Sequence, residues 1–207
     1  AMVMSAESIV VTGSRIHRAA QEELGDLKLY RIPARVTVAS NSQKQVAMLE
    51  QEGVRVRTVY RARFHPSAEW ETEPARRVLV SRNRTAEGLG LPLPAGRLVL
   101  FGAGRERPIL LGEGFVEDRA IGEDVEIELG PAPGVMTRLA QISEGEWQLS
   151  VTSDRSEPVR FEAEIDDAGS AFAPSTRLTR RNGRALWSVT VPANGRAVLR
   201  YRFAPRS

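Results

Sequence analysis

The chain of 207 residues contains no cysteine. Disulfide bonds, thiolate metal sites and cysteine nucleophiles are therefore excluded from its chemistry. Histidine is scarce: His17 lies beside Arg15 and Arg18, and His65 precedes Pro66 in a loop rich in glutamate. A loop histidine followed by proline is more typical of a turn than of a metal ligand or a positioned base. We therefore interpret His65 as a turn residue, while His17 falls in a predicted flexible lead-in, which is a poor place for a positioned base.

Long apolar runs and lysine are missing too. No segment reaches the roughly 18 consecutive apolar residues that cross a membrane, so no transmembrane segment is expected. Only two of the 29 basic residues are lysines, and the arginines are interleaved with 26 acidic residues to give a formal net charge of +3. Nucleic-acid-binding proteins concentrate positive charge on one face, so no nucleic-acid partner is predicted.

Familiar catalytic motifs are also missing. The chain has no G-x-S-x-G, H-E-x-x-H or G-x-x-x-x-G-K-[ST] sequence. The run Gly102-Ala103-Gly104-Arg105 lacks the third glycine of a dinucleotide-binding loop and predicts a hairpin turn. The motifs therefore predict no catalytic residue, no cofactor and no metal site.

Alternation of apolar and polar residues dominates the chain from Pro33 onward, which is typical of half-buried strands. Asn182-Gly183 and Asn194-Gly195 supply the positive φ that hairpin turns need. A short helical turn is predicted over residues 18–24. Strands are predicted over residues 35–38, 53–64, 97–101, 124–129, 147–151, 159–165, 187–191 and 196–203.

About twelve such strands at this spacing favour an all-β protein, and specifically an antiparallel β-sandwich of two packed immunoglobulin-like units. A composition shift at Gly130-Pro131-Ala132-Pro133-Gly134 suggests the boundary. We predict an extended leader over residues 1–23, which opens with a cloning remnant, a first unit over 24–133 and a smaller second unit over 134–207. Trp147 and Trp187 lie mid-strand and are predicted to be core residues.

Acidic residues are concentrated between positions 113 and 128. A row of like charges on one strand repels itself, so facing arginines or a cation must compensate. Arginine is abundant enough to do so, and the calcium-loop pattern is missing. A carbohydrate-binding or hydrolytic module stays open as an alternative, because the separation of two carboxylates depends on the fold. The residues are Glu113, Glu117, Asp118, Glu123, Asp124, Glu126 and Glu128.

Two stretches of sequence carry a family resemblance. One covers residues 24–33 and 36–46; the other covers 83–97, with the run Leu91-Pro92-Leu93-Pro94-Ala95-Gly96, and continues at 111–114 and 121–125. The chain resembles, from about Leu24 to Phe203, the bacterial proteins grouped as domain of unknown function 4139, some labelled mucoidy-inhibitor-like. The resemblance implies a β-rich domain of an exported envelope protein and supplies no catalytic residues. Within it, Asn83 is expected to cap a turn with its side chain.

Residues 7–16 resemble a different element, the box by which outer-membrane receptors bind TonB. Such a box pairs as an added strand with the edge of the TonB C-terminal sheet. A β-branched composition favours an extended conformation for Ile9, Val10, Val11 and Thr12, and Gly13 allows the strand to end. These five residues are the candidate partner-binding site, and the TonB C-terminal domain is the candidate partner. An ordinary first strand or leader is the alternative.

The sequence thus predicts a non-enzymatic protein of the bacterial cell envelope, periplasmic or associated with the outer membrane, that acts through protein–protein contacts. The location follows from the resemblance, since no signal peptide is found in the sequence. The alternatives are an accessory protein that engages TonB through residues 7–16, and a carbohydrate-binding or hydrolytic module. A contact module predicts an exposed apolar patch or an unpaired strand edge, whereas a hydrolase predicts a cleft with two carboxylates.

Overall fold

The computed structural model describes residues 20–24, 27–31, 40–41, 49–103, 107–167 and 170–205. This part of the chain is built from strands and has no α-helix, only the 3₁₀ turn η1 (Thr85–Glu87), which confirms the all-β prediction. The strands are β1 (Ala20–Leu24), β2 (Leu27–Arg31), β3 (Arg57–Phe64), β4 (Trp70–Arg82), β5 (Gly96–Gly102), β6 (Ile109–Val116), β7 (Asp124–Ser143), β8 (Glu146–Ser153), β9 (Val159–Ile165), β10 (Ser170–Pro174), β11 (Thr179–Arg181), β12 (Arg184–Val191) and β13 (Arg196–Pro205).

Nine strands form one sheet in the order β10-β13-β8-β7-β4-β3-β9-β12-β11. Its neighbours run antiparallel except β3 and β9, which are parallel, so the sheet is mixed rather than antiparallel throughout. The pattern of apolar residues within a strand fixes which face is buried and leaves the partner and its direction open. The remaining strands form two hairpins, β1–β2 and β5–β6. The helical turn predicted over 18–24 is wrong, because residues 20–24 pair with β2.

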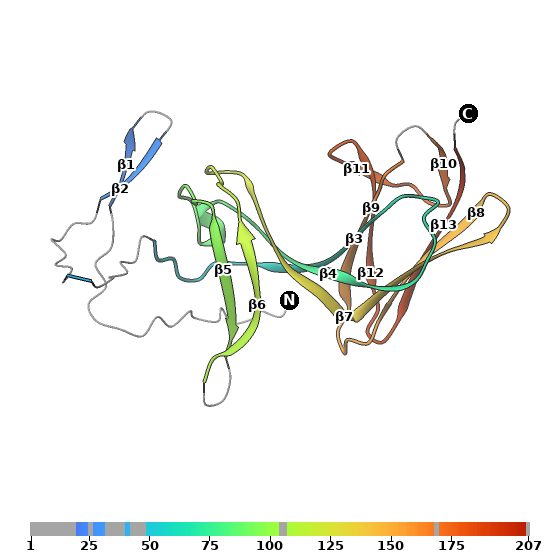
Figure 1. Cartoon of the computed structure of the whole chain (residues 1–207), viewed down its shortest axis with the longest axis horizontal. Helices are drawn as coiled ribbons and strands as arrows, with labels where there is room; N and C mark the ends of the chain where they lie inside the picture. Colours follow the sequence, from blue (N-terminus) through green and yellow to red (C-terminus); the bar gives the residue numbers. More distant parts are fainter. Residues whose placement is uncertain are drawn as a thin grey trace.

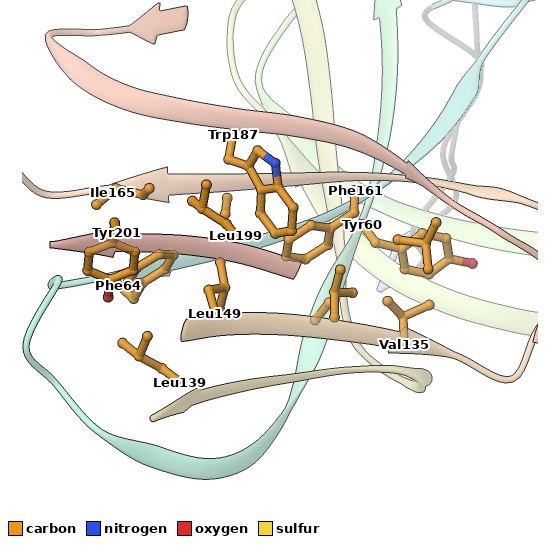
Figure 2. Close-up of a cluster of buried hydrophobic side chains, with 14 of the residues drawn as sticks. Tyr60, Phe64, Val135, Leu139, Leu149, Phe161, Ile165, Trp187, Leu199 and Tyr201 are labelled. Carbon is orange, nitrogen blue, oxygen red and sulfur yellow. The ribbon is translucent and has the colours of Figure 1, made fainter. Parts of the chain in front are cut away.

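The nine-stranded sheet curls around one main core. The largest side chains in that core come from strands far apart in the sheet and point toward one another (Figure 2). Strand β12 contacts both β8 and β13 across this core. Trp147 and Trp187 belong to it, as predicted. Its fully buried members include Phe161, Leu139, Leu149, Ile165 and Leu199.

The long strands β4 and β7 also carry a smaller second core. They run from the curled region to the β5–β6 hairpin, which lies at their far end (Figure 1). Leu79 of β4 packs there with Val125, Ile127 and Leu129 of β7. The hairpin adds partly buried side chains, among them those of Leu98, Leu100 and Val116.

The predicted boundary at residues 130–134 falls inside β7, which continues through it without a break. Gly130 has a φ of 92°, and the register between β4 and β7 shifts between Pro74 and Ala75 and again between Arg76 and Val78. Before this point β7 faces the second core; after it, from Ala132 on, β7 faces the main core. The composition shift marks a strand passing from one core to the other. The division into residues 24–133 and 134–207 stays a prediction.

Asn83 fastens the loops beside the second core. It is fully buried, and its amide group donates hydrogen bonds to the carbonyls of Leu91 (2.7 Å), Ala120 (3.0 Å) and Arg119 (3.2 Å). Its side-chain oxygen accepts a hydrogen bond from the N–H of Gly90 (2.9 Å). The side chain therefore caps the turn, as predicted, and also joins that turn to the loop before β7.

Candidate protein-contact surface

The β5–β6 hairpin presents two different faces. In its antiparallel register Arg97 lies opposite Phe115 and Val99 lies opposite Glu113. Alternate residues of β5 point to the second core, as the burial of Leu98 and Leu100 shows. The residues between them point away from it.

Gly114 allows β6 of the hairpin to lie directly on β7. A Cβ atom at Gly114 would sit 2.7 Å from the carbonyl oxygen of Glu128 and 2.7 Å from the Cγ2 of Ile127, closer than real side chains approach. At Gly112 the neighbours are Leu129 and Arg77, and Arg77 donates a hydrogen bond to the carbonyl of Leu111 (2.6 Å). Backbone-to-backbone packing therefore holds the hairpin in place.

The face that points away from the second core is apolar. We call it the outer face, and it consists of Arg97, Val99, Phe101, Leu110, Glu113 and Phe115. Val99 and Phe101 are 41% and 42% exposed, and Leu110 and Phe115 are each 54% exposed. The hairpin adds two more exposed apolar residues near its tip, Ile109 and Leu111. Isolated exposed apolar residues are ordinary, but a contiguous group of large ones marks an interaction site.

Both edges of this hairpin lack a neighbouring strand among the described residues, because β5 and β6 pair only with each other. β5 has no proline or lysine, the residues that commonly blunt a strand edge. The hairpin thus combines an apolar patch with unpaired strand edges, either of which is expected of a contact module.

The sequence-based prediction placed the contact site at residues 9–13, but continuous apolar runs in the sequence also indicate the outer face. Residues 98–101 are Leu-Val-Leu-Phe, and residues 109–111 are Ile-Leu-Leu. A strand with one face in solvent alternates apolar with polar residues, whereas continuous apolar runs are typical of strands covered on both faces. The continuous runs therefore predict a second covering layer, and the described residues supply only one.

The acidic residues between positions 113 and 128 contact arginines or backbone N–H groups rather than one another. Glu113 pairs with Arg97 (3.1 Å), Glu128 pairs with Arg76, and Asp124 lies 3.8 Å from Arg82. These contacts favour the arginine-partnered interpretation of the row of acids. Glu117 pairs with Arg119, while Asp118 and Glu123 accept hydrogen bonds from the backbone N–H groups of Ala95 and Ala120.

Glu126 belongs to a partly buried network. It pairs with Arg61 (2.9 Å) and with Arg181, and both arginines also pair with Glu162 (3.0 and 3.1 Å). Burial and the neighbouring Arg61 lower the pKa of Arg181, but a guanidinium stays charged at neutral pH. Arg160 also lies 3.7 Å from Glu162, and both carboxylates are therefore held by arginines of other strands or of their own.

His65 occupies a turn against the main core. Its carbonyl accepts a hydrogen bond from the N–H of Ala68 (3.1 Å), and its ring meets that of Phe203 edge-on at 5.6 Å between centroids. Nδ1 lies 3.0 Å from the hydroxyl of Ser67. Across the described part of the chain, no three histidine, aspartate or glutamate side chains gather as a metal site would require.

An open hollow of about 640 Å³ lies between the β7–β8 turn and the β10–β13 pair. Glu146 and Arg202 form an ion pair (3.1 Å) in its wall, beside Phe172 and Phe203. A hydrogen bond from Ser143 and the charge of Arg202 lower the pKa of the Glu146 carboxyl. The hollow therefore offers an ion pair whose charges are already matched.

The predicted partner-binding residues Ile9, Val10, Val11, Thr12 and Gly13 lie outside the described residues, as does His17. The interpretation of residues 7–16 as a TonB-binding segment stays a prediction. Among the residues that the structure does describe, no helix is long and apolar enough to cross a membrane.

Comparison with protein-family models, with curated proteins and with solved structures gives no match to this chain.

Proposed function

We propose that this chain is a non-enzymatic protein-contact module that binds another protein chain through the outer face of the β5–β6 hairpin. The observation that carries the proposal is the exposure of Val99, Phe101, Leu110 and Phe115 on one face of a hairpin whose edges lack a neighbouring strand among the described residues. Aromatic residues held in the centre of such a face are the usual source of binding energy at protein interfaces.

The hairpin is also prepared for binding. Its inner side chains pack on the second core, and the close approach at Gly114 fixes β6 on β7. A preordered face loses little conformational entropy when a partner covers it. Covering its apolar area contributes about 25 cal/mol for each Å² removed from water.

The cell envelope is the proposed location, and the sequence resemblance is what supports it. The proposal also keeps the immunoglobulin-like description of the fold. Its support is that β12 lies across the main core from β8 and β13, as the two layers of a sandwich do.

Site-specific photocrosslinking in bacterial cells tests the proposed function. Phe115 is replaced by the photoreactive analogue benzoylphenylalanine, and the matched control carries the same analogue at Val198, an exposed apolar position of β13. We expect an adduct heavier than the chain for position 115 and none for position 198. The proposal fails if position 115 gives no adduct with a protein.

A further inference from the structure

We infer that the partner of the outer face is a second copy of this chain, packed face to face on the same surface about a two-fold axis. This inference rests on the proposed contact function and names its partner.

Charge on the outer face is self-complementary. The face carries one cation, Arg97, and one anion, Glu113, whose side chains are 82% and 53% exposed and form an ion pair within the chain (3.1 Å). They occupy one diagonal of the hairpin, because Arg97 lies opposite Phe115 and Glu113 lies opposite Val99. In a two-fold pair whose axis runs along the other diagonal, the two ion pairs lie head to tail, so that Arg97 of each copy also meets Glu113 of the other and no like charges are forced together.

The apolar residues fit the same arrangement. Val99 and Phe115 occupy the other diagonal, and Phe101 lies directly opposite Leu110 toward the tip. An axis along this second diagonal brings Phe115 against Phe115 and Val99 against Val99 of the other copy, so apolar side chains meet as they do between the inner faces of two packed sheets. A copy of the chain thus supplies both the missing second layer and the matching charges.

A different protein would have to leave the Arg97–Glu113 pair in water or meet it with an anion and a cation of its own. A lipid surface would cover the apolar residues but would leave Glu113 facing the acyl region or an anionic headgroup layer, which is unfavourable. These partners explain the exposure of Phe101 and Phe115, and a second copy also explains the placement of Arg97 and Glu113.

The first test is the mass of the purified full chain by light scattering and sedimentation over a wide range of concentration. We expect a reversible equilibrium between the 22.8 kDa chain and a species of twice that mass. Phe115→Asp should abolish the dimer, because it places like charges in an apolar interface. The matched control Val198→Asp, on exposed β13, should dimerise like the wild type.

A charge-swap series tests the two-fold pairing itself. Arg97→Glu alone and Glu113→Arg alone should each raise the dimer dissociation constant about tenfold, since each places like charges together. Because Arg97 and Glu113 also pair within one chain, the decisive sample is an equimolar mixture of the two single variants, in which like charges remain within each chain and opposite charges meet only between the two copies. The mixture should restore dimerisation, and its failure to do so overturns the proposed pairing.

Other outcomes separate this inference from the proposed function. A chain that stays monomeric while position 115 crosslinks to a different protein overturns the second copy and retains the contact function. A monomer that crosslinks to its own residues 1–19, or to lipid, overturns the second copy as well. A dimer unaffected by Phe115→Asp places the interface elsewhere and also overturns it.

Discussion

At the scale of single residues, Asn83 shows how one side chain can satisfy several backbone groups at once. It follows directly after β4 and lies between two loops whose carbonyl and N–H groups would otherwise be buried without partners. An asparagine suits this position because its amide donates and accepts together. Leaving such groups without partners costs more than the hydrogen bonds themselves contribute.

Asn83→Ala should lower the free energy of unfolding by about 2–4 kcal/mol. Asn83→Asp is the matched control for shape: it keeps the acceptor for Gly90 but loses the donors to Leu91 and Ala120. It should be no more stable than the alanine variant at neutral pH. Urea denaturation measures both, and losses below about 0.5 kcal/mol would contradict the role given to Asn83.

Tyr201 is a second residue whose environment makes a measurable difference. Its hydroxyl donates a hydrogen bond to the carbonyl of Pro66 (2.6 Å), and burial raises its pKa well above the usual 10. The folded chain therefore holds a proton that the unfolded chain releases near pH 10. This contribution to stability is present below pH 10 and is lost as the pH rises toward the pKa of the folded state.

Tyr201→Phe should cost about 1 kcal/mol at neutral pH, through the lost hydrogen bond. Above pH 10 the difference from the wild type should shrink, because only the wild type has this phenol to ionise on unfolding. Urea midpoints across a pH series give the comparison. A difference that stays constant through this range would show that Tyr201 ionises alike in both states.

At the scale of secondary-structure elements, the important contact is the approach of β6 to β7. It depends on Gly114, where an added methyl group would meet the backbone of β7, which moves less readily than a side chain. The outer face keeps its position only while this contact holds.

Gly114→Ala should lower the free energy of unfolding by about 1–3 kcal/mol, because the inserted Cβ forces β6 away from Glu128. Gly96→Ala is the matched control in β5, where an added Cβ meets nothing within 4 Å. Thermal unfolding and the hydrogen exchange of β6 amides should change in the first variant and not in the second. Equal effects at both positions would contradict the packing argument.

At the scale of the whole molecule, the curl of the sheet brings distant strands together. Glu126 of β7 contacts Arg181 of β11, although four strands lie between β7 and β11 in the sheet. Adjacent strands are about 4.8 Å apart, so a flat sheet would separate them by about 24 Å. The contact exists only because the sheet is strongly curved.

Glu126→Gln should destabilise the fold by about 1–3 kcal/mol, since it removes the charge that both Arg61 and Arg181 face. Glu128→Gln is the matched control on the same strand. Its pair with Arg76 is half exposed and should contribute less than about 0.5 kcal/mol. If urea denaturation finds the two losses equal, the network does not join these strands as described.

Much of the fold could be predicted from the local alternation of apolar and polar residues and from the Asn-Gly turns. Residues 159–165 coincide with β9, and the predicted strand at 196–203 lies within β13. Trp147 and Trp187 are buried as expected, and Asn182 adopts the positive φ that its Asn-Gly turn predicted. These features depend on neighbours along the chain, through side-chain alternation and the freedom of asparagine and glycine at positive φ.

The sequence by itself determined that the chain is built of strands, where most of them lie and which of their faces are buried. Only the tertiary structure decided that β3 runs parallel to β9, that β7 continues through residues 130–134 and that one sheet serves two cores. It also decided that the acids at 113–128 meet arginines from other strands and that the outer face has no covering layer among the described residues. The physical reason is that period-two alternation records burial, whereas strand partners and ion pairs are set by contacts between residues far apart in sequence.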